Sequence, residues 1–176
     1  MLLALFCSIF LSFCPLDQAS QQLSDQPKIT VYIFLLDECK ICREYAPELN
    51  NIYESYKTAD IEFVGVFPNF SSKRENIEKF RAEFDIEFEL KTDYFKKLSK
   101  KFDAKILPEV FVYDNEKAKI LYSGRIDDRY VSIGQRRRVI KTYDLKRTLD
   151  NIISQNDILI TRTAPIGCFI NYNDDL

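Results

Sequence analysis

The sequence predicts an α/β fold in which helices flank both faces of a central mixed sheet. The runs 28–36 and 61–67 are β-branched and aromatic almost throughout, as expected for strands buried on both faces. Between them, 39–57 has apolar residues spaced by three or four positions, which predicts a helix and therefore a parallel crossover. The runs 109–113 and 119–122 flank a turn and predict an antiparallel hairpin, which makes the sheet mixed.

Shorter elements complete the predicted order. They are a helix over 73–84, an extended piece at 88–91, a helix over 94–102 and an amphipathic helix over 143–154. Ser71 and Ser72 precede the helix over 73–84 and are predicted to cap its N terminus. In the last helix, Ile152 and Ile153 are among the apolar residues predicted to face the core. The length of 176 residues fits one domain with an appended segment.

The amino-terminal segment differs from the rest in composition. It is uncharged up to residue 16 and falls short of the roughly 20 apolar residues that span a bilayer. We expect a bacterial export signal that is cleaved, lipidated at Cys14 or retained as a membrane tether, and a periplasmic or extracytoplasmic membrane-associated location. The predicted divisions are a signal or membrane/lipid anchor at 1–16, a linker at 17–27, one domain at 28–154 and a C-terminal extension at 155–176.

The chain contains no histidine. Ser-His-Asp and Cys-His nucleophile pairs are therefore excluded, together with the zinc, haem and copper sites that use histidine. The formal net charge of −2 gives no reason to expect a nucleic-acid partner. Carboxylates, amines, phenols and thiols remain for chemistry. The thiols are Cys7, Cys14, Cys39, Cys42 and Cys168.

The strongest motif is Cys39-Lys-Ile-Cys42, which stands where a buried strand gives way to a helix. Unpaired N–H groups and the dipole at a helix start favour the thiolate of Cys39, and the thiolate is the nucleophile in disulfide exchange. Cys42 lies one turn further along, close enough to attack a mixed disulfide. Lys40 adds a positive charge that favours the thiolate, whereas Asp37 and Glu38 oppose it.

Other uses of these two cysteines are less favoured. Structural zinc commonly takes four ligands, and Cys168 is the one further cysteine in the body of the chain. Copper carriers commonly add histidine or methionine, and the single methionine is Met1. A purely structural disulfide would suit an exported protein. We expect no metal and favour redox exchange, with the Cys39–Cys42 disulfide as the redox group.

Three further features accompany the motif. Pro47 interrupts the helix five residues after the second cysteine, Leu107-Pro108 precedes an apolar strand, and an insertion over 73–93 adds a helix and a short strand. In this combination the segment 28–154 resembles the thioredoxin superfamily. Within it, the chain is most similar to the redoxin branch of exported bacterial thioredoxin-like and alkyl hydroperoxide reductase/thiol-specific antioxidant proteins.

The resemblance implies a thioredoxin-like fold and a thiol–disulfide oxidoreductase that acts on protein substrates. Cys39 would attack or receive the disulfide, Cys42 would resolve it, and Leu107 with Pro108, matching the family's cis-proline, would position the substrate chain. The implied partners are protein thiols and disulfides and an upstream electron donor or acceptor protein. No cofactor is implied beyond the redox-active disulfide.

Two positions near the motif bear on how the cysteines are activated. Ile33 stands where thioredoxins carry a buried acid, which removes one proton acceptor for Cys42. Glu109 directly follows Pro108 and is either a substitute for that acid or, as we expect, a solvated loop carboxylate.

Two rival functions stay open. A peroxidase of the peroxiredoxin kind would place Thr or Ser three residues before its reactive cysteine, but Leu36 and Cys39 occupy those positions before Cys39 and Cys42. Arg125 is either the cation that such a site uses or an ordinary surface arginine. The second rival is a non-catalytic binding module whose CxxC motif forms a structural disulfide.

The extension at 155–176 shows no helical periodicity and contains Cys168. Three roles are open for this cysteine. It is a third redox thiol that forms a disulfide with Cys39 or Cys42, or it is a buried free thiol, or it forms a disulfide with another chain. The arginine run 136–138 is predicted to lie in a solvated loop.

Overall fold

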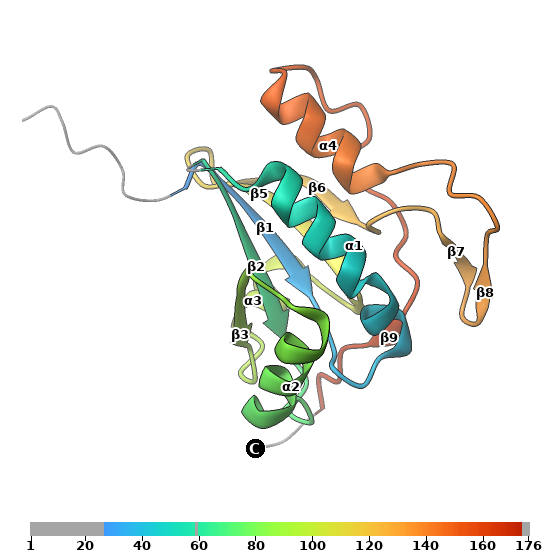
Figure 1. Cartoon of the computed structure of the whole chain (residues 1–176). Coiled ribbons are helices and arrows are strands. Elements are labelled where there is room, and N and C mark those ends of the chain that lie inside the picture. Colours follow the sequence, from blue (N-terminus) through green and yellow to red (C-terminus); the bar gives the residue numbers. More distant parts are fainter. Residues whose placement is uncertain (1–26, 59, 174–176) are drawn as a thin grey trace, which may run out of the picture.

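A computed structural model describes residues 27–58 and 60–173 (Figure 1). The strands are β1 (Ile29–Phe34), β2 (Ile61–Phe67), β3 (Glu89–Thr92), β4 (Ile106–Leu107), β5 (Glu109–Asp114), β6 (Lys119–Gly124), β7 (Tyr130–Ser132), β8 (Gln135–Arg136) and β9 (Cys168–Phe169). The helices are α1 (Lys40–Tyr56), α2 (Arg74–Phe84), α3 (Lys97–Phe102) and α4 (Asp144–Ile153). The predicted order of elements is present, and the short strands β4, β7, β8 and β9 are additional.

The central sheet has the order β3-β2-β1-β5-β6. β1 pairs with β2 in parallel and with β5 antiparallel, so the sheet is mixed, as predicted. β5 and β6 form the predicted hairpin. Phe34, the last residue of β1, lies opposite Glu109, the first residue of β5. This register brings the segment that follows β1 and the segment that precedes β5 to the same edge of the sheet.

Helices cover both faces of the sheet, which confirms the predicted architecture. On one face Phe63 of β2 packs against Tyr53 of α1, with ring centroids 5.6 Å apart. On the other face Tyr32 of β1 packs against Phe102 of α3, with centroids 4.8 Å apart. α2 contacts α1 directly, and an ion pair links α4 to α1. The cysteine motif therefore lies at the start of a helix that packs on the sheet and contacts both α2 and α4.

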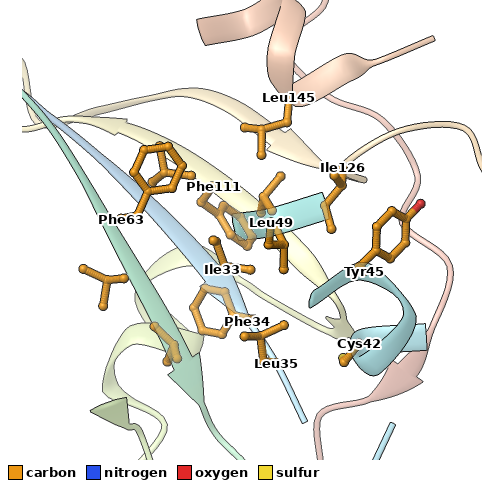
Figure 2. Packing of buried hydrophobic residues seen from close by; sticks show 14 of the residues in the cluster. Ile33, Phe34, Leu35, Cys42, Tyr45, Leu49, Phe63, Phe111, Ile126 and Leu145 are labelled. Carbon is orange, nitrogen blue, oxygen red and sulfur yellow. The ribbon is translucent and has the colours of Figure 1, made fainter. Parts of the chain in front are cut away.

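The apolar stripe of α1 faces the sheet. Tyr45, Leu49 and Ile52 recur at helical spacing, and all three are buried. Figure 2 shows Tyr45 and Leu49 together with Ile33 of β1, and Cys42 on the same helix. Packing thus holds the first turn of α1 in place over the end of β1.

The predicted serine caps of α2 are wrong. Lys73 occupies the N-cap position, and no side chain caps the helix. Ser72, which lies after Ser71, is fully buried and donates a hydrogen bond to the Asp37 carboxylate instead. A buried carboxylate without a partner would cost more than the ~1 kcal/mol that a cap contributes. The bond to Asp37 fixes the loop that leads to Cys39.

One predicted core position in α4 is also wrong. Leu145 and Leu149 are fully buried, but Ile153 is 55% exposed. Ile152 and Ile153 differ by roughly 100° around the helix axis, so only one of them can continue the stripe of the two leucines. Ile152 does so and packs against the core.

The arginine run 136–138 lies partly in a hairpin instead of the predicted loop. Arg136 belongs to β8, which pairs with β7, and its guanidinium lies 3.1 Å from the Glu44 carboxylate of α1. Arg137 pairs with Asp128 at 3.1 Å. The Arg136–Glu44 pair attaches the hairpin to α1, the helix that carries the cysteine motif.

The predicted signal or anchor at 1–16, with Cys14, lies outside the described residues, as does the linker up to residue 26. In the part of the chain that the structure describes, no helix combines the length and apolar character needed to cross a membrane.

Replacing Phe34 with alanine should lower the free energy of unfolding by about 3–5 kcal/mol, because the ring is fully buried against Phe102 and Phe111. Chemical denaturation of the reduced protein measures this loss. Phe95→Ala is the matched control: its ring is 69% exposed, so the change should be less than about 0.5 kcal/mol. Equal losses in the two variants would contradict the packing of β1 against α3.

Candidate active site

The two motif cysteines lie at the start of α1, next to the end of β1. Cys39 immediately precedes the helix: its carbonyl accepts a hydrogen bond from the Arg43 N–H at 3.0 Å, and its N–H donates to Leu36 O at 3.1 Å. Cys42 follows in the first turn and is fully buried, and Cys39 is only 2% exposed. Cys39, Cys42 and Cys168 are all free thiols.

The surroundings of Cys39 lower its pKa from the ordinary 9.0 to about 5. The largest contribution is the hydrogen bond that the Cys42 thiol donates to the Cys39 sulfur. Burial opposes it, and hydrogen bonds from the Cys168 thiol and from the backbone N–H groups of Cys42 and Ile41 add to it. Above pH 5 Cys39 is therefore mainly a thiolate, the reactive form of cysteine.

Cys42 has the opposite character. Burial raises its pKa most, and the hydrogen bond with Cys39 and the negative charge there raise it further. Cys42 therefore keeps its proton as long as Cys39 is charged. The pair consists of one charged nucleophile and one protonated thiol in contact with it.

Lys40 plays a smaller part than expected. Its side chain is 88% exposed, and its ammonium group lies 3.9 Å from the Glu44 carboxylate. The groups with the largest effect on the Cys39 pKa are two thiols and two backbone N–H groups, and Lys40 is not among them. The acid at Asp37 is bonded to Ser72. Neutral donors thus stabilise the thiolate.

The loop before β5 lies against Cys39. The Leu107–Pro108 peptide is cis, and Leu107 is fully buried. The Cys39 sulfur lies 3.5 Å from the Leu107 carbonyl oxygen. The structure therefore brings Cys39, Leu107 and Pro108 together, as the register of β1 and β5 requires.

Glu109 is not the solvated loop acid that the sequence led us to expect. It begins β5, is buried, and accepts hydrogen bonds from the N–H groups of Lys105 at 3.0 Å and Ile106 at 3.3 Å. Burial raises the pKa of its carboxyl group. Glu109 is enclosed because it lies on β5, opposite Phe34, and β5 has a neighbouring strand on each side, β1 and β6. Its carboxylate holds the backbone that leads into β4.

Arg125 joins the end of β6 to α4. Its Nε donates to the Asp144 carboxylate at 2.7 Å, and its Nη2 donates to the Thr142 hydroxyl at 3.2 Å. Asp144 is buried, so this ion pair is a fixed structural contact. The guanidinium is thus neutralised within the fold.

Sequence reasoning missed the strand that holds Cys168. β9 pairs antiparallel with β4, and Cys168 lies opposite Leu107. Burial raises the pKa of Cys168 to about 12, and the hydrogen bond to Cys39 raises it as well. A two-residue strand has no alternation that a sequence pattern could reveal.

In the described part of the chain, no set of three or more cysteine or acidic side chains is arranged to hold a metal ion.

A groove of about 310 Å³ opens beside Cys39. The start of α1, the β7–β8 hairpin and β9 provide its walls, with Tyr130, Ile133 and Phe169 among the lining side chains. Ile133 and Phe169 are each 72% exposed, so the groove presents apolar surface to solvent. Exposed apolar surface next to a reactive group is a feature of binding sites, and it suits an apolar side chain of a peptide. The sequence carried no signal for this groove, because its walls come from three distant segments.

A family model described as Thioredoxin-like matches residues 26–120, a segment that includes the CxxC motif and the Leu107–Pro108 peptide. No curated protein matches the chain.

Several solved structures share the fold. An uncharacterized conserved protein from Geobacillus kaustophilus has a TM-score of 0.73 at 21% identity, over 86% of this chain and 81% of its own. A hypothetical protein from Sinorhizobium meliloti has a TM-score of 0.69 at 20% identity, over 86% and 83%. A secreted disulfide oxidoreductase from Mycobacterium tuberculosis has a TM-score of 0.53 at 16% identity, over 72% and 84%. At these identities the similarity shows the fold alone.

The thiolate of Cys39 should be present in acidic solution. In the reduced protein the ultraviolet thiolate absorbance should rise with a midpoint near pH 5, because the charged form predominates above a pKa of about 5. Cys42→Ala should move the midpoint upward, since it removes the hydrogen bond with the largest effect. Cys7→Ala is the control for loss of a thiol and should leave the midpoint unchanged. A wild-type midpoint at about 8.5, the value of a free cysteine, would contradict the description of the site.

Proposed function

Because the chain belongs to the thioredoxin-like family, we propose that it is a thiol–disulfide oxidoreductase that exchanges disulfides with protein substrates. The observation that carries the proposal is the position of Cys39 at the start of α1, 3.5 Å from the Leu107 carbonyl oxygen and one turn before the buried Cys42, where the pKa of Cys39 is lowered to about 5 and that of Cys42 is raised. A thiolate attacks a disulfide, and an adjacent thiol can then release the product. The Cys39–Cys42 disulfide would be the redox group of this exchange.

The reaction begins when the Cys39 thiolate attacks one sulfur of a substrate disulfide. That bond breaks, the other substrate sulfur leaves as a thiolate, and a mixed disulfide joins Cys39 to the substrate. Cys39 is uncharged in this mixed disulfide, so its negative charge no longer raises the pKa of Cys42. Cys42 transfers its proton to the departing substrate sulfur and attacks Cys39. The first substrate sulfur takes its proton from water, so the substrate leaves with two thiols and the protein holds the Cys39–Cys42 disulfide; two electrons have moved to the substrate.

Positioning of the substrate is assigned to Leu107 and Pro108. The Leu107 carbonyl lies 3.5 Å from the Cys39 sulfur, so a chain that pairs with this backbone would place its own sulfur next to Cys39. The apolar groove beside Cys39 provides room for a neighbouring substrate side chain. These features favour an extended protein segment as the substrate.

The two rival functions receive less support. A peroxidase would need a cation beside its thiolate, but the Arg125 guanidinium is paired with Asp144. A non-catalytic module would need no reactive thiolate, whereas Cys39 is the most acidic of the three described thiols. Disulfide exchange accounts for both the free thiols and their unequal pKa values.

We also propose that the protein works outside the cytoplasm. The uncharged segment 1–16 is suited to export, and the Mycobacterium tuberculosis oxidoreductase that shares the fold is a secreted protein. Disulfide exchange with protein partners suits an oxidising compartment. The same segment, with or without a lipid at Cys14, would serve as a membrane tether.

The proposal predicts that the protein, kept reduced by a dithiol, accelerates the reduction of insulin disulfides. Cys39→Ser should return the rate to that of the dithiol alone, because the attacking sulfur is absent. Cys42→Ser combined with Cys168→Ser should accumulate a mixed disulfide between Cys39 and insulin, since no neighbouring thiol can release it. Turbidity and non-reducing electrophoresis measure the two effects.

Cys7→Ser is the matched control and should reduce insulin at the wild-type rate. A wild-type protein without insulin reductase activity that consumes hydrogen peroxide would support the peroxidase instead. If it shows neither activity and its thiols form a disulfide that resists mild reductant, the binding module is the better description.

A further inference from the structure

The strand β9 occupies the backbone next to the reactive cysteine. It pairs antiparallel with β4, and the register places Cys168 directly opposite Leu107. The carbonyl of Leu107 is also 3.5 Å from the Cys39 sulfur. The same peptide group of β4 therefore contacts Cys39 and aligns Cys168. Hydrogen bonding between the two thiols is among the causes that lower the pKa of Cys39 and raise that of Cys168.

The pairing of β9 with β4 is close. A Cβ atom on Gly167 would lie 2.0 Å from the Leu107 carbonyl oxygen and 3.1 Å from the Pro108 nitrogen. Any other residue at 167 would force the two backbones apart. Glycine is thus required for β9 to approach the loop that carries Pro108, and this requirement places Cys168 at Cys39.

Hydrogen bonds hold the chain on both sides of Cys168. Before it, the Thr163 N–H donates to Ser123 O at 3.0 Å, and after it, the Ile170 N–H donates to Lys105 O at 2.9 Å. The Tyr172 hydroxyl donates to Ala104 O at 2.6 Å. A thiol held from both sides has a far higher effective concentration at Cys39 than a thiol in solution.

From these contacts we infer that Cys168 is a third redox cysteine, held by β9 in the place that a substrate cysteine would take, and that it forms a disulfide with Cys39. The inference rests on the proposed function, because the Cys39–Cys42 disulfide is its starting material. The extended segment that contains Gly167 and Cys168 is then an internal substrate.

The step conserves electrons within the chain. The Cys168 thiol gives its proton to Cys42 and its sulfur attacks Cys39. The Cys39–Cys42 bond breaks, the Cys39–Cys168 bond forms, and Cys42 becomes a free thiol. The reverse step restores the first disulfide, so no external oxidant or reductant is consumed.

The pairing of β9 with β4 also limits the access of protein substrates to the Cys39 sulfur. Cys39 is only 2% exposed, and β9 lies on the edge that a substrate chain would use. A protein substrate must therefore displace β9, which means that Cys168 on β9 competes with substrates for Cys39. Good substrates should have a small residue before their cysteine, as Gly167 stands before Cys168.

The test uses the full chain with Cys7→Ser and Cys14→Ser, so that the three described cysteines are the only thiols. After oxidation and acid quench, trypsin separates them, because it cleaves after Lys28, Lys40, Arg43 and Arg162. Cys39 then lies in peptide 29–40, Cys42 in 41–43 and Cys168 in 163–176. Mass spectrometry should find 29–40 linked to 41–43 and also to 163–176.

The decisive variant adds Cys42→Ser. In glutathione buffer of about 1 mM it should form the Cys39–Cys168 disulfide and carry at least about tenfold less glutathione on Cys39 than the variant with Cys42→Ser and Cys168→Ser. Gly167→Val in the Cys42→Ser background keeps the thiols of Cys39 and Cys168 but separates the backbones of β9 and β4. Glutathione on Cys39 should therefore rise towards the level of the variant that carries both Cys42→Ser and Cys168→Ser. Circular dichroism shows whether these variants are folded.

Equal glutathione on Cys39 in the Cys42→Ser protein with and without Cys168 would overturn the inference, even if the wild type reduces insulin. Wild-type protein that fails to reduce insulin while Cys42→Ser still forms the Cys39–Cys168 disulfide would overturn the proposed function and support the third redox cysteine. The two proposals can therefore fail separately.

Discussion

The antiparallel pairing of β1 with β5 is the constraint on which the rest of the site depends. Because Phe34 lies opposite Glu109, the chain that leaves β1 towards Cys39 and the chain that enters β5 through Pro108 meet at one edge of the sheet. The contact between the Cys39 sulfur and the Leu107 carbonyl joins residues 68 positions apart. A slip of one residue in this register would turn the buried side chains of β1 to the opposite face and remove the contact.

A protein without histidine must stabilise a thiolate by other means, and the fold does so with neutral donors. The Cys39 sulfur accepts hydrogen bonds from two thiols and from N–H groups at the start of α1. These bonds outweigh the burial that would otherwise raise its pKa. Because Cys42 is fully buried beside it, the proton stays on Cys42 until the charge on Cys39 is used. The order of the two cysteines in the proposed reaction follows from this unequal burial.

A substrate protein would have to bind at this same edge of the sheet, and the C-terminal extension covers part of it. β9 covers the backbone of β4, while the β7–β8 hairpin, attached to α1 through Arg136 and Glu44, forms the wall of the apolar groove. The reactive sulfur thus lies beneath a short strand and beside a groove. In the proposed scheme this strand is both an occupant of the site and the carrier of Cys168.

Local patterns in the sequence determined the two buried strands, the helix that starts at the CxxC motif and the pair of cysteines able to exchange disulfides, because apolar periodicity and residue spacing act within one element. Only the tertiary structure decided that Ser72 bonds to Asp37 and that Glu109 is enclosed. It also decided that Cys168 meets Cys39, through a strand of two residues. Each of these outcomes depends on a partner distant in sequence, since burial and long-range hydrogen bonds are set by the register between strands, which no local pattern encodes.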